Sequence, residues 1–84
     1  MRNLTLSFIK RHRLEDSSDA FKEGLDCFFE DLEVNLPRLT VKELSGLIKD
    51  KLKRARENLK YAPTEDAKEF QKGFIVVCEF YLGI

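Results

Sequence analysis

The chain has 84 residues, of which 43% are hydrophobic and 36% are charged, and its formal net charge is zero. This length predicts one domain, residues 1–84, with enough apolar residues for a small core. No apolar run reaches the roughly 18 residues of a transmembrane helix, so we expect no membrane contact. The first residues (MRNLTLSFIKRHR) lack the long apolar stretch of a signal peptide, and we therefore expect a cytoplasmic protein.

The zero net charge conceals a strong segregation along the chain. Residues 1–14 carry four bases and no acid, and residues 15–36 carry eight acids and one base. Residues 37–60 carry eight bases and three acids, and residues 61–84 carry four acids and two bases. Such blocks predict either an acidic element packed beside a basic one, or two exposed faces of opposite sign that attract partners.

Residues 3–9 (NLTLSFI) alternate between polar and apolar side chains, which is typical of a half-buried β-strand. A helix is the alternative, because Leu4 and Phe8 lie four residues apart. The basic group that follows, residues 10–13, surrounds His12. We interpret this group as a solvated connector, with a contact to phosphate or to an acidic protein as the alternative.

A first amphipathic helix is predicted over residues 19–34, after the helix-starting residues 16–19 (DSSD). Gly24 within it costs about 1 kcal/mol relative to alanine, and its presence suggests the close approach of another helix. Pro37 ends the helix, because the residue before a proline disfavours the α conformation. The polar side of this helix, which we call the acidic face, is a candidate partner-binding surface. The acidic face consists of Glu23, Asp26, Glu30 and Glu33.

A central helix is predicted over residues 40–60, where apolar residues recur every three or four positions. Thr40 and Glu43 form the sequence pattern of a capping box at its start. Basic side chains, which we call the basic stripe, lie beside the apolar positions and are a candidate site for a partner or a nucleic acid. The basic stripe consists of Lys49, Lys53, Arg56 and Lys60. A solvated charged surface is the plainer interpretation of the same residues.

A third helix is predicted over residues 65–82, starting at Thr64. Residues 74–82 are apolar on nearly every side, so the alternative is a strand that pairs with residues 3–9. We favour the helix, because Phe70 and Phe74 keep helical spacing across Gly73. An apolar helix near the end of a small protein is either its core or a contact surface. As a contact surface it predicts a self-interface made of Phe74, Val77, Phe80 and Tyr81.

The sequence therefore predicts a mainly α fold: a small three-helix domain, with a possible short β-strand at residues 3–9. The link between the first two predicted helices is only a few residues long, which favours an antiparallel hairpin or a tight corner. In such a hairpin the acidic face could lie near the basic stripe.

Patterns typical of catalysis or of cofactor binding are missing from the sequence. There is no glycine-rich phosphate loop and no Gly-x-Ser-x-Gly turn. Carboxylates four residues apart occur, but without the histidines of a metal motif. Cys27, Cys78 and His12 are too few for a zinc site. We therefore expect no enzyme, no metal, no cofactor and no small-molecule substrate. The two cysteines are interpreted as buried free thiols, with a disulfide as the alternative.

Residues 52–74 (LKRARENLKYAPTEDAKEFQKGF) resemble the helical hairpin of many short phage-encoded accessory proteins. In those proteins a charged helix with a run like residues 54–59 meets a short break with a proline. A helix that opens on acidic residues follows, with a motif like residues 69–73. The functions of these proteins are mostly unassigned. The resemblance implies a small, non-enzymatic protein that binds a partner in an infected bacterial cytoplasm.

Together these features predict a protein-interaction module that binds itself or a host or phage partner through charged helix faces, as an inhibitor or regulator would. The alternative is a nucleic-acid-binding accessory protein whose basic stripe neutralises phosphates. The zero net charge and the acidic block argue against this alternative. The basic stripe also lacks interleaved aromatic residues on which bases could stack.

Overall fold

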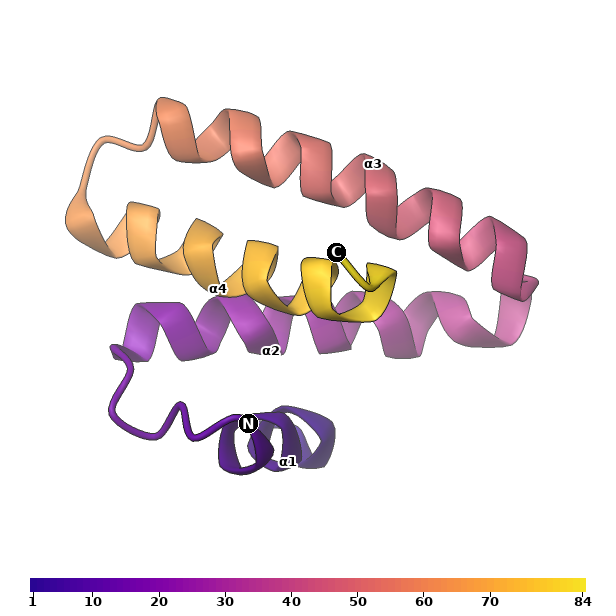
Figure 1. The fold of residues 1–84 in the computed structure, drawn as a ribbon, viewed down its shortest axis with the longest axis horizontal. Helices are drawn as coiled ribbons and strands as arrows, with labels where there is room; N and C mark the ends of the chain where they lie inside the picture. Colours follow the sequence, from indigo (N-terminus) through magenta and orange to yellow (C-terminus); the bar gives the residue numbers. More distant parts are fainter.

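The computed structural model describes the backbone of residues 1–84 and every side chain except that of Leu36. The described backbone forms helices and no strand (Figure 1). The mainly α class is confirmed, but the count of three helices is wrong, because the N-terminal segment forms a fourth. The elements are α1 (Asn3–Arg11), α2 (Asp19–Asn35), the 3-10 turn η1 (Leu36–Arg38), α3 (Val41–Lys60) and α4 (Glu65–Leu82).

Of the two alternatives for residues 3–9, strand and helix, the structure has the helix, α1, and the possible strand is absent. Its buried residues are Thr5, Phe8 and Ile9, which share one helical face. Leu4 and Leu6, whose alternation suggested a strand, are 47% and 51% exposed. Residues 74–82 are helical, as favoured above, so a strand at residues 3–9 would have no mate for its backbone hydrogen bonds.

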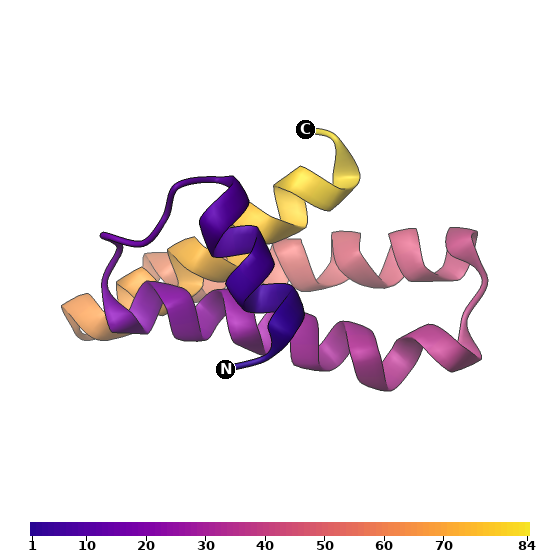
Figure 2. The ribbon, with the colours of Figure 1, turned by 90° about the horizontal axis from the view of Figure 1, so that it is seen from below.

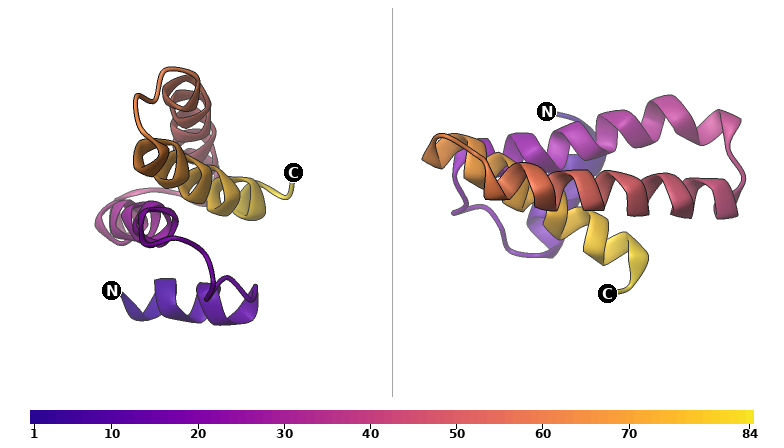
Figure 3. Two further views of the ribbon diagram at one scale, coloured as in Figure 1. Left: turned by 90° about the vertical axis from the view of Figure 1, so that its left-hand side faces the viewer. Right: turned by 90° about the horizontal axis from the view of Figure 1, so that it is seen from above.

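The helices stack in the spatial order α3, α4, α2, α1 (Figures 1 and 3). Helix α3 runs antiparallel to both α2 and α4, so α2 and α4 are parallel neighbours. Helix α1 crosses over α2 obliquely on the side away from α3 (Figure 2). Because α4 lies between α2 and α3, the polar surfaces of α2 and α3 are kept largely apart.

Hydroxyl side chains start three of the helices, as their sequences predict. The Ser18 hydroxyl accepts a hydrogen bond from the Phe21 N–H at the start of α2. Thr40 and Glu43 form the predicted capping box of α3, and the Thr64 hydroxyl accepts from the Ala67 N–H in α4. Each cap satisfies an N–H group that has no partner within its own helix, and so fixes where that helix begins.

Two glycines bring α2 and α4 into direct backbone contact. A Cβ atom added at Gly24 would lie 2.0 Å from the carbonyl oxygen of Phe70, and one added at Gly73 would lie 2.1 Å from the carbonyl oxygen of Phe21. Only glycine fits at either position without moving the facing backbone. The close approach predicted for Gly24 is therefore confirmed.

The core lies where α2, α3 and α4 meet, and α1 covers one side of it. Its buried side chains are Phe8, Ile9, Leu25, Phe28, Phe29, Ile48, Leu52, Ala55, Phe74, Val77 and Cys78. Two residues of the predicted self-interface, Phe74 and Val77, are thus buried within the chain and are not available to a second copy. The other two, Phe80 and Tyr81, remain nearly half exposed.

Candidate partner-binding groove

The acidic face of α2 is largely occupied by the N-terminal end of α1. The Arg2 guanidinium lies 3.4 Å from Asp26, 3.5 Å from Glu30 and 3.2 Å from Glu33. The fourth residue of this face, Glu23, is exposed and forms no ion pair with Arg2. One base from the start of the chain therefore contacts three of the four acids of this candidate binding face, and its single positive charge balances one of their negative charges.

Asp26 is the centre of this contact. Its Oδ1 accepts hydrogen bonds from the Thr5 hydroxyl at 2.6 Å and from the Arg2 backbone N–H at 3.1 Å. Partial burial raises the pKa of the Asp26 carboxyl, but the hydrogen bonds and the positive charge of Arg2 outweigh burial, and the net pKa is lowered. The Asp26 carboxylate thus caps α1 from a neighbouring helix, in the place of the side-chain cap that Arg2 does not provide.

The acidic face of α2 does not lie against the basic stripe of α3. In the part of the chain that the structure describes, one ion pair joins α2 to α3, between Asp31 and Lys51 at 3.1 Å, and neither residue belongs to the predicted sets. The acidic face therefore does not lie near the basic stripe, as a simple hairpin of α2 and α3 would allow, because α4 separates the two helices and α1 covers the acidic face.

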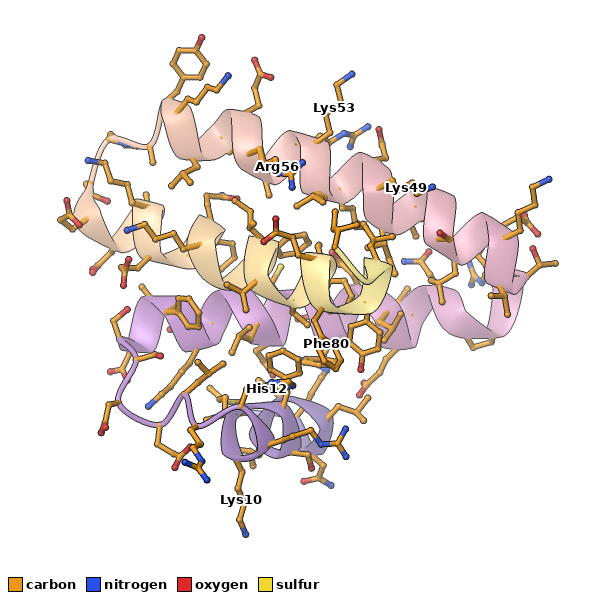
Figure 4. The ribbon with its side chains drawn as sticks, in the orientation of Figure 1. Lys10, His12, Lys49, Lys53, Arg56 and Phe80 are labelled. Atoms are coloured by element: carbon orange, nitrogen blue, oxygen red, sulfur yellow. The ribbon has the colours of Figure 1, made fainter. Side chains whose placement is uncertain are left out.

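The basic stripe lines a groove at the junction of α3 with the end of α4. We call this the basic groove; its volume is about 630 Å³. Figure 4 shows Lys49, Lys53 and Arg56 along α3, which lies at the opposite end of the stack of helices from α1. The lining consists of Lys49, Leu52, Lys53, Arg56, Glu57, Lys60, Leu82 and Ile84. The structure therefore brings all four predicted basic residues together around apolar side chains from two elements.

Three of the four bases in the basic groove have no internal counter-charge. Among the described side chains, Lys49, Lys53 and Lys60 have no carboxylate within the 4.0 Å of an ion pair. Arg56 alone is paired, to Glu79 at 2.9 Å. Like charges three or four residues apart on a helix destabilise it by about 0.2–0.5 kcal/mol per pair. The like-charged neighbours of the basic stripe repel one another, and Glu57, four residues after Lys53 and three before Lys60, offsets part of that repulsion.

The bases follow the helix axis at a regular spacing. With a rise of about 1.5 Å per residue, the Cα positions of Lys49, Lys53, Arg56 and Lys60 lie about 6, 4.5 and 6 Å apart along α3. Carboxylates at positions i, i+4, i+7 and i+11 of a second helix have the same spacing. The basic groove therefore matches one face of an acidic helix.

A second groove of about 630 Å³ lies where α2 and α4 begin, and it contains Glu23 together with Asp19 and Asp66. Acidic residues in the first turns of helices are explained by the helix macrodipole, which favours negative charge there. Glu23, three residues before Asp26 on α2, is the member of the acidic face that lines this second groove. The position of these acids at helix starts accounts for the charge of the second groove, and we assign it no binding role.

The remaining candidate groups form no catalytic or metal-binding arrangement. No three described His, Cys, Asp or Glu side chains are grouped so that they could hold a metal ion. His12 packs against the rings of Phe8 and Phe80, with centroid distances of 4.3 and 4.7 Å, and Figure 4 shows His12 beside Phe80. Both cysteines are free thiols. Burial raises the pKa of Cys27, and that of Cys78 to about 12.

Sequence reasoning missed the two residues that distinguish the charged surfaces, Arg2 and Glu79. Arg2 is remote in sequence from the acids it binds, and only the docking of α1 brings it there. Glu79 had a visible signal, since it is the one charged residue in the apolar segment 73–84. A lone carboxylate in such a segment is a candidate for an ion pair, and the partner of Glu79 is Arg56.

Comparisons of the chain with family models, with curated proteins and with solved structures found no match. Among the described helices, none combines the length and the apolar character needed to cross a bilayer.

Proposed function

We propose that this chain is a non-enzymatic protein-interaction module whose basic groove binds an acidic amphipathic helix of a partner protein. The observation that carries the proposal is the grouping of Lys49, Lys53, Arg56 and Lys60 around Leu52, Leu82 and Ile84. Recognition of a helix in a groove uses apolar anchors at helical spacing, and the charged rim selects the partner. Together with the resemblance of residues 52–74 to phage accessory proteins, this suggests a regulator or inhibitor that occupies a site on its partner.

The composition of the basic groove favours a protein helix over a nucleic acid. The partly exposed Leu82 and the exposed Ile84 offer contacts to aliphatic side chains, whereas single-stranded nucleic acids need aromatic platforms for their bases. Glu57 lies within the same lining, where it would repel a phosphate backbone. A protein helix can place a lysine opposite Glu57, which a nucleic acid cannot do.

The test is direct binding of a synthetic helix. The probe is a fluorescein-labelled peptide with glutamates at positions i, i+4, i+7 and i+11 and leucines between them on the same face. A scrambled peptide of equal composition and a labelled 20-base-pair DNA duplex serve as comparison probes. Fluorescence polarisation at low and high salt gives the affinity of each probe. We expect the ordered peptide to bind more tightly than the scrambled peptide and the duplex.

The variant Lys49→Glu/Lys53→Glu should weaken peptide binding more than tenfold, because two attractive charges become repulsive. The matched control is Lys10→Glu/Lys42→Glu, which changes the net charge equally at exposed positions outside the basic groove. Equal losses in both variants would mean non-specific attraction. Tighter binding of the duplex, with an affinity that falls steeply with salt, would replace the proposal by the nucleic-acid alternative. If neither probe binds, the basic groove is not a binding site.

A further inference from the structure

Glu79 of α4 forms an ion pair with Arg56 at the edge of the basic groove. Its Oε2 accepts a hydrogen bond from Arg56 Nη2 at 2.9 Å, and both side chains are partly exposed. Leu82, one helical turn further along α4, lines the basic groove. The carboxylate of Glu79 therefore meets Arg56 at the edge of the surface that would receive the partner.

We propose that Glu79 is an internal competitor that occupies Arg56 in the free protein, and that a carboxylate of the bound helix takes its place. This inference rests on the proposed function, because it concerns the same groove. In the free protein, Lys49, Lys53 and Lys60 attract the acidic helix and Arg56 is held back by Glu79. Glu79 then determines which partner side chain can reach Arg56.

The exchange is feasible because the Arg56–Glu79 pair is exposed. An exposed ion pair contributes little to stability, so an incoming carboxylate has only a weak interaction to displace. The released Glu79 carboxylate remains accessible to water and needs no other partner. The Arg56 guanidinium can then bind the incoming carboxylate through two parallel hydrogen bonds, which are stronger than a single one.

The same competition gives selectivity. A neutral glutamine or serine of a partner forms weaker hydrogen bonds with a guanidinium than the carboxylate of Glu79 does. Only a negatively charged side chain can therefore displace Glu79. Helices that carry a carboxylate opposite Arg56 are accepted, and otherwise similar polar helices are disfavoured at this position.

Glu57 provides a matched control within the same groove. It is exposed, lines the basic groove and forms no ion pair with any described side chain. Glu57→Gln and Glu79→Gln remove the same charge from the same surface. Only Glu79→Gln also releases Arg56, so any additional effect of that variant reports the competition rather than the net charge.

The experiment measures the affinity of the acidic helical peptide for the wild type, for Glu57→Gln and for Glu79→Gln, each also in an Arg56→Gln background. We expect Glu79→Gln to tighten binding two- to fivefold more than Glu57→Gln, and the difference to vanish in the Arg56→Gln background. In addition, Glu79→Gln should reduce the discrimination against a peptide with glutamine opposite Arg56.

Equal gains in the two variants, or a difference that persists without Arg56, would overturn the role of Glu79 and leave the proposed function intact. Weaker binding by Glu79→Gln than by the wild type would show that Glu79 orients Arg56 for the partner, and would also overturn the competition. If no variant binds the peptide, the proposed function fails and this inference fails with it.

Discussion

The acidic face of α2 and the basic stripe of α3 each carry four charges of one sign, but they differ in how those charges are used. Three of the four acids are bound by Arg2, and Asp26 also accepts hydrogen bonds from the start of α1. Three of the four bases have no described counter-charge and surround an apolar groove. The acidic face therefore fixes the N-terminal end of α1 to α2, whereas the basic stripe remains accessible to a ligand.

This difference follows from the order of the helices. Helix α4 lies between α2 and α3 (Figures 1 and 3), and among the described side chains no residue of the acidic face forms an ion pair with the basic stripe. The N-terminal base that reaches the acidic face is Arg2, which immediately precedes α1. Opposite charge blocks in a sequence thus indicate which elements can attract one another, but the packing of the apolar residues decides which of them meet.

The largest effect is expected when the scaffold between the two charged surfaces is broken. Gly24→Ala places a Cβ atom 2.0 Å from the Phe70 carbonyl oxygen, so α2 and α4 must separate. We expect the free energy of unfolding to fall by about 3 kcal/mol, the upper part of the range for overpacked sites. Urea denaturation followed by circular dichroism measures the change.

Gly46→Ala in α3 is the matched control, since no atom lies within 4 Å of its added Cβ. There the better helix propensity of alanine should raise the free energy of unfolding by up to about 1 kcal/mol. If both alanine variants were stabilised, the close crossing of α2 and α4 would be wrong, and with it the separation of the charged surfaces.

The next largest effect is expected at the acidic face. Asp26→Ala leaves the buried Thr5 hydroxyl and the Arg2 backbone N–H without their acceptor. An unsatisfied buried group costs about 1–3 kcal/mol, and we expect the free energy of unfolding to fall by that amount. Glu30→Ala, which removes an exposed partner of the same Arg2, should cost at most about 1 kcal/mol. Similar losses in both variants would mean that Asp26 acts through its charge alone.

The contribution of Asp26 should also depend on pH. Because the folded state lowers the pKa of this carboxyl below its ordinary value of 3.8, the stabilisation is present above that value and is lost as pH falls through the folded pKa. The wild type should therefore exceed Asp26→Asn in stability at pH 7, and by less at pH 3. Denaturation of both proteins at the two pH values measures this; a constant difference would contradict the lowered pKa.

The periodicity of apolar residues predicted α2, α3 and α4 well, because their capping residues and helical faces agree with one another. It failed at residues 3–9, where the alternation of Leu4, Leu6 and Phe8 suggested a strand. Thr5 and Ile9 are the buried companions of Phe8, and a buried threonine is not recognisable without its acceptor, Asp26. The members of the basic stripe were predictable from α3 alone. Their apolar neighbours Leu82 and Ile84 were not, because they come from the end of a different helix.

The smallest effect is expected when the basic stripe is neutralised. Lys49→Gln/Lys53→Gln removes the repulsion of Lys53 by Lys49 and Arg56 together with the attraction of Lys53 to Asp50 and Glu57. These contributions are similar in size and opposite in sign, so the free energy of unfolding should change by at most about 0.5 kcal/mol. Lys51→Gln is the same substitution in the same helix, but it removes the ion pair with Asp31 and should lower stability by up to about 1 kcal/mol. A clear loss of stability in the double variant would mean that these lysines support the fold. An unchanged or increased stability, together with weaker peptide binding, would mean that these lysines are retained for a partner, because they would then contribute nothing to the free energy of unfolding of the chain alone.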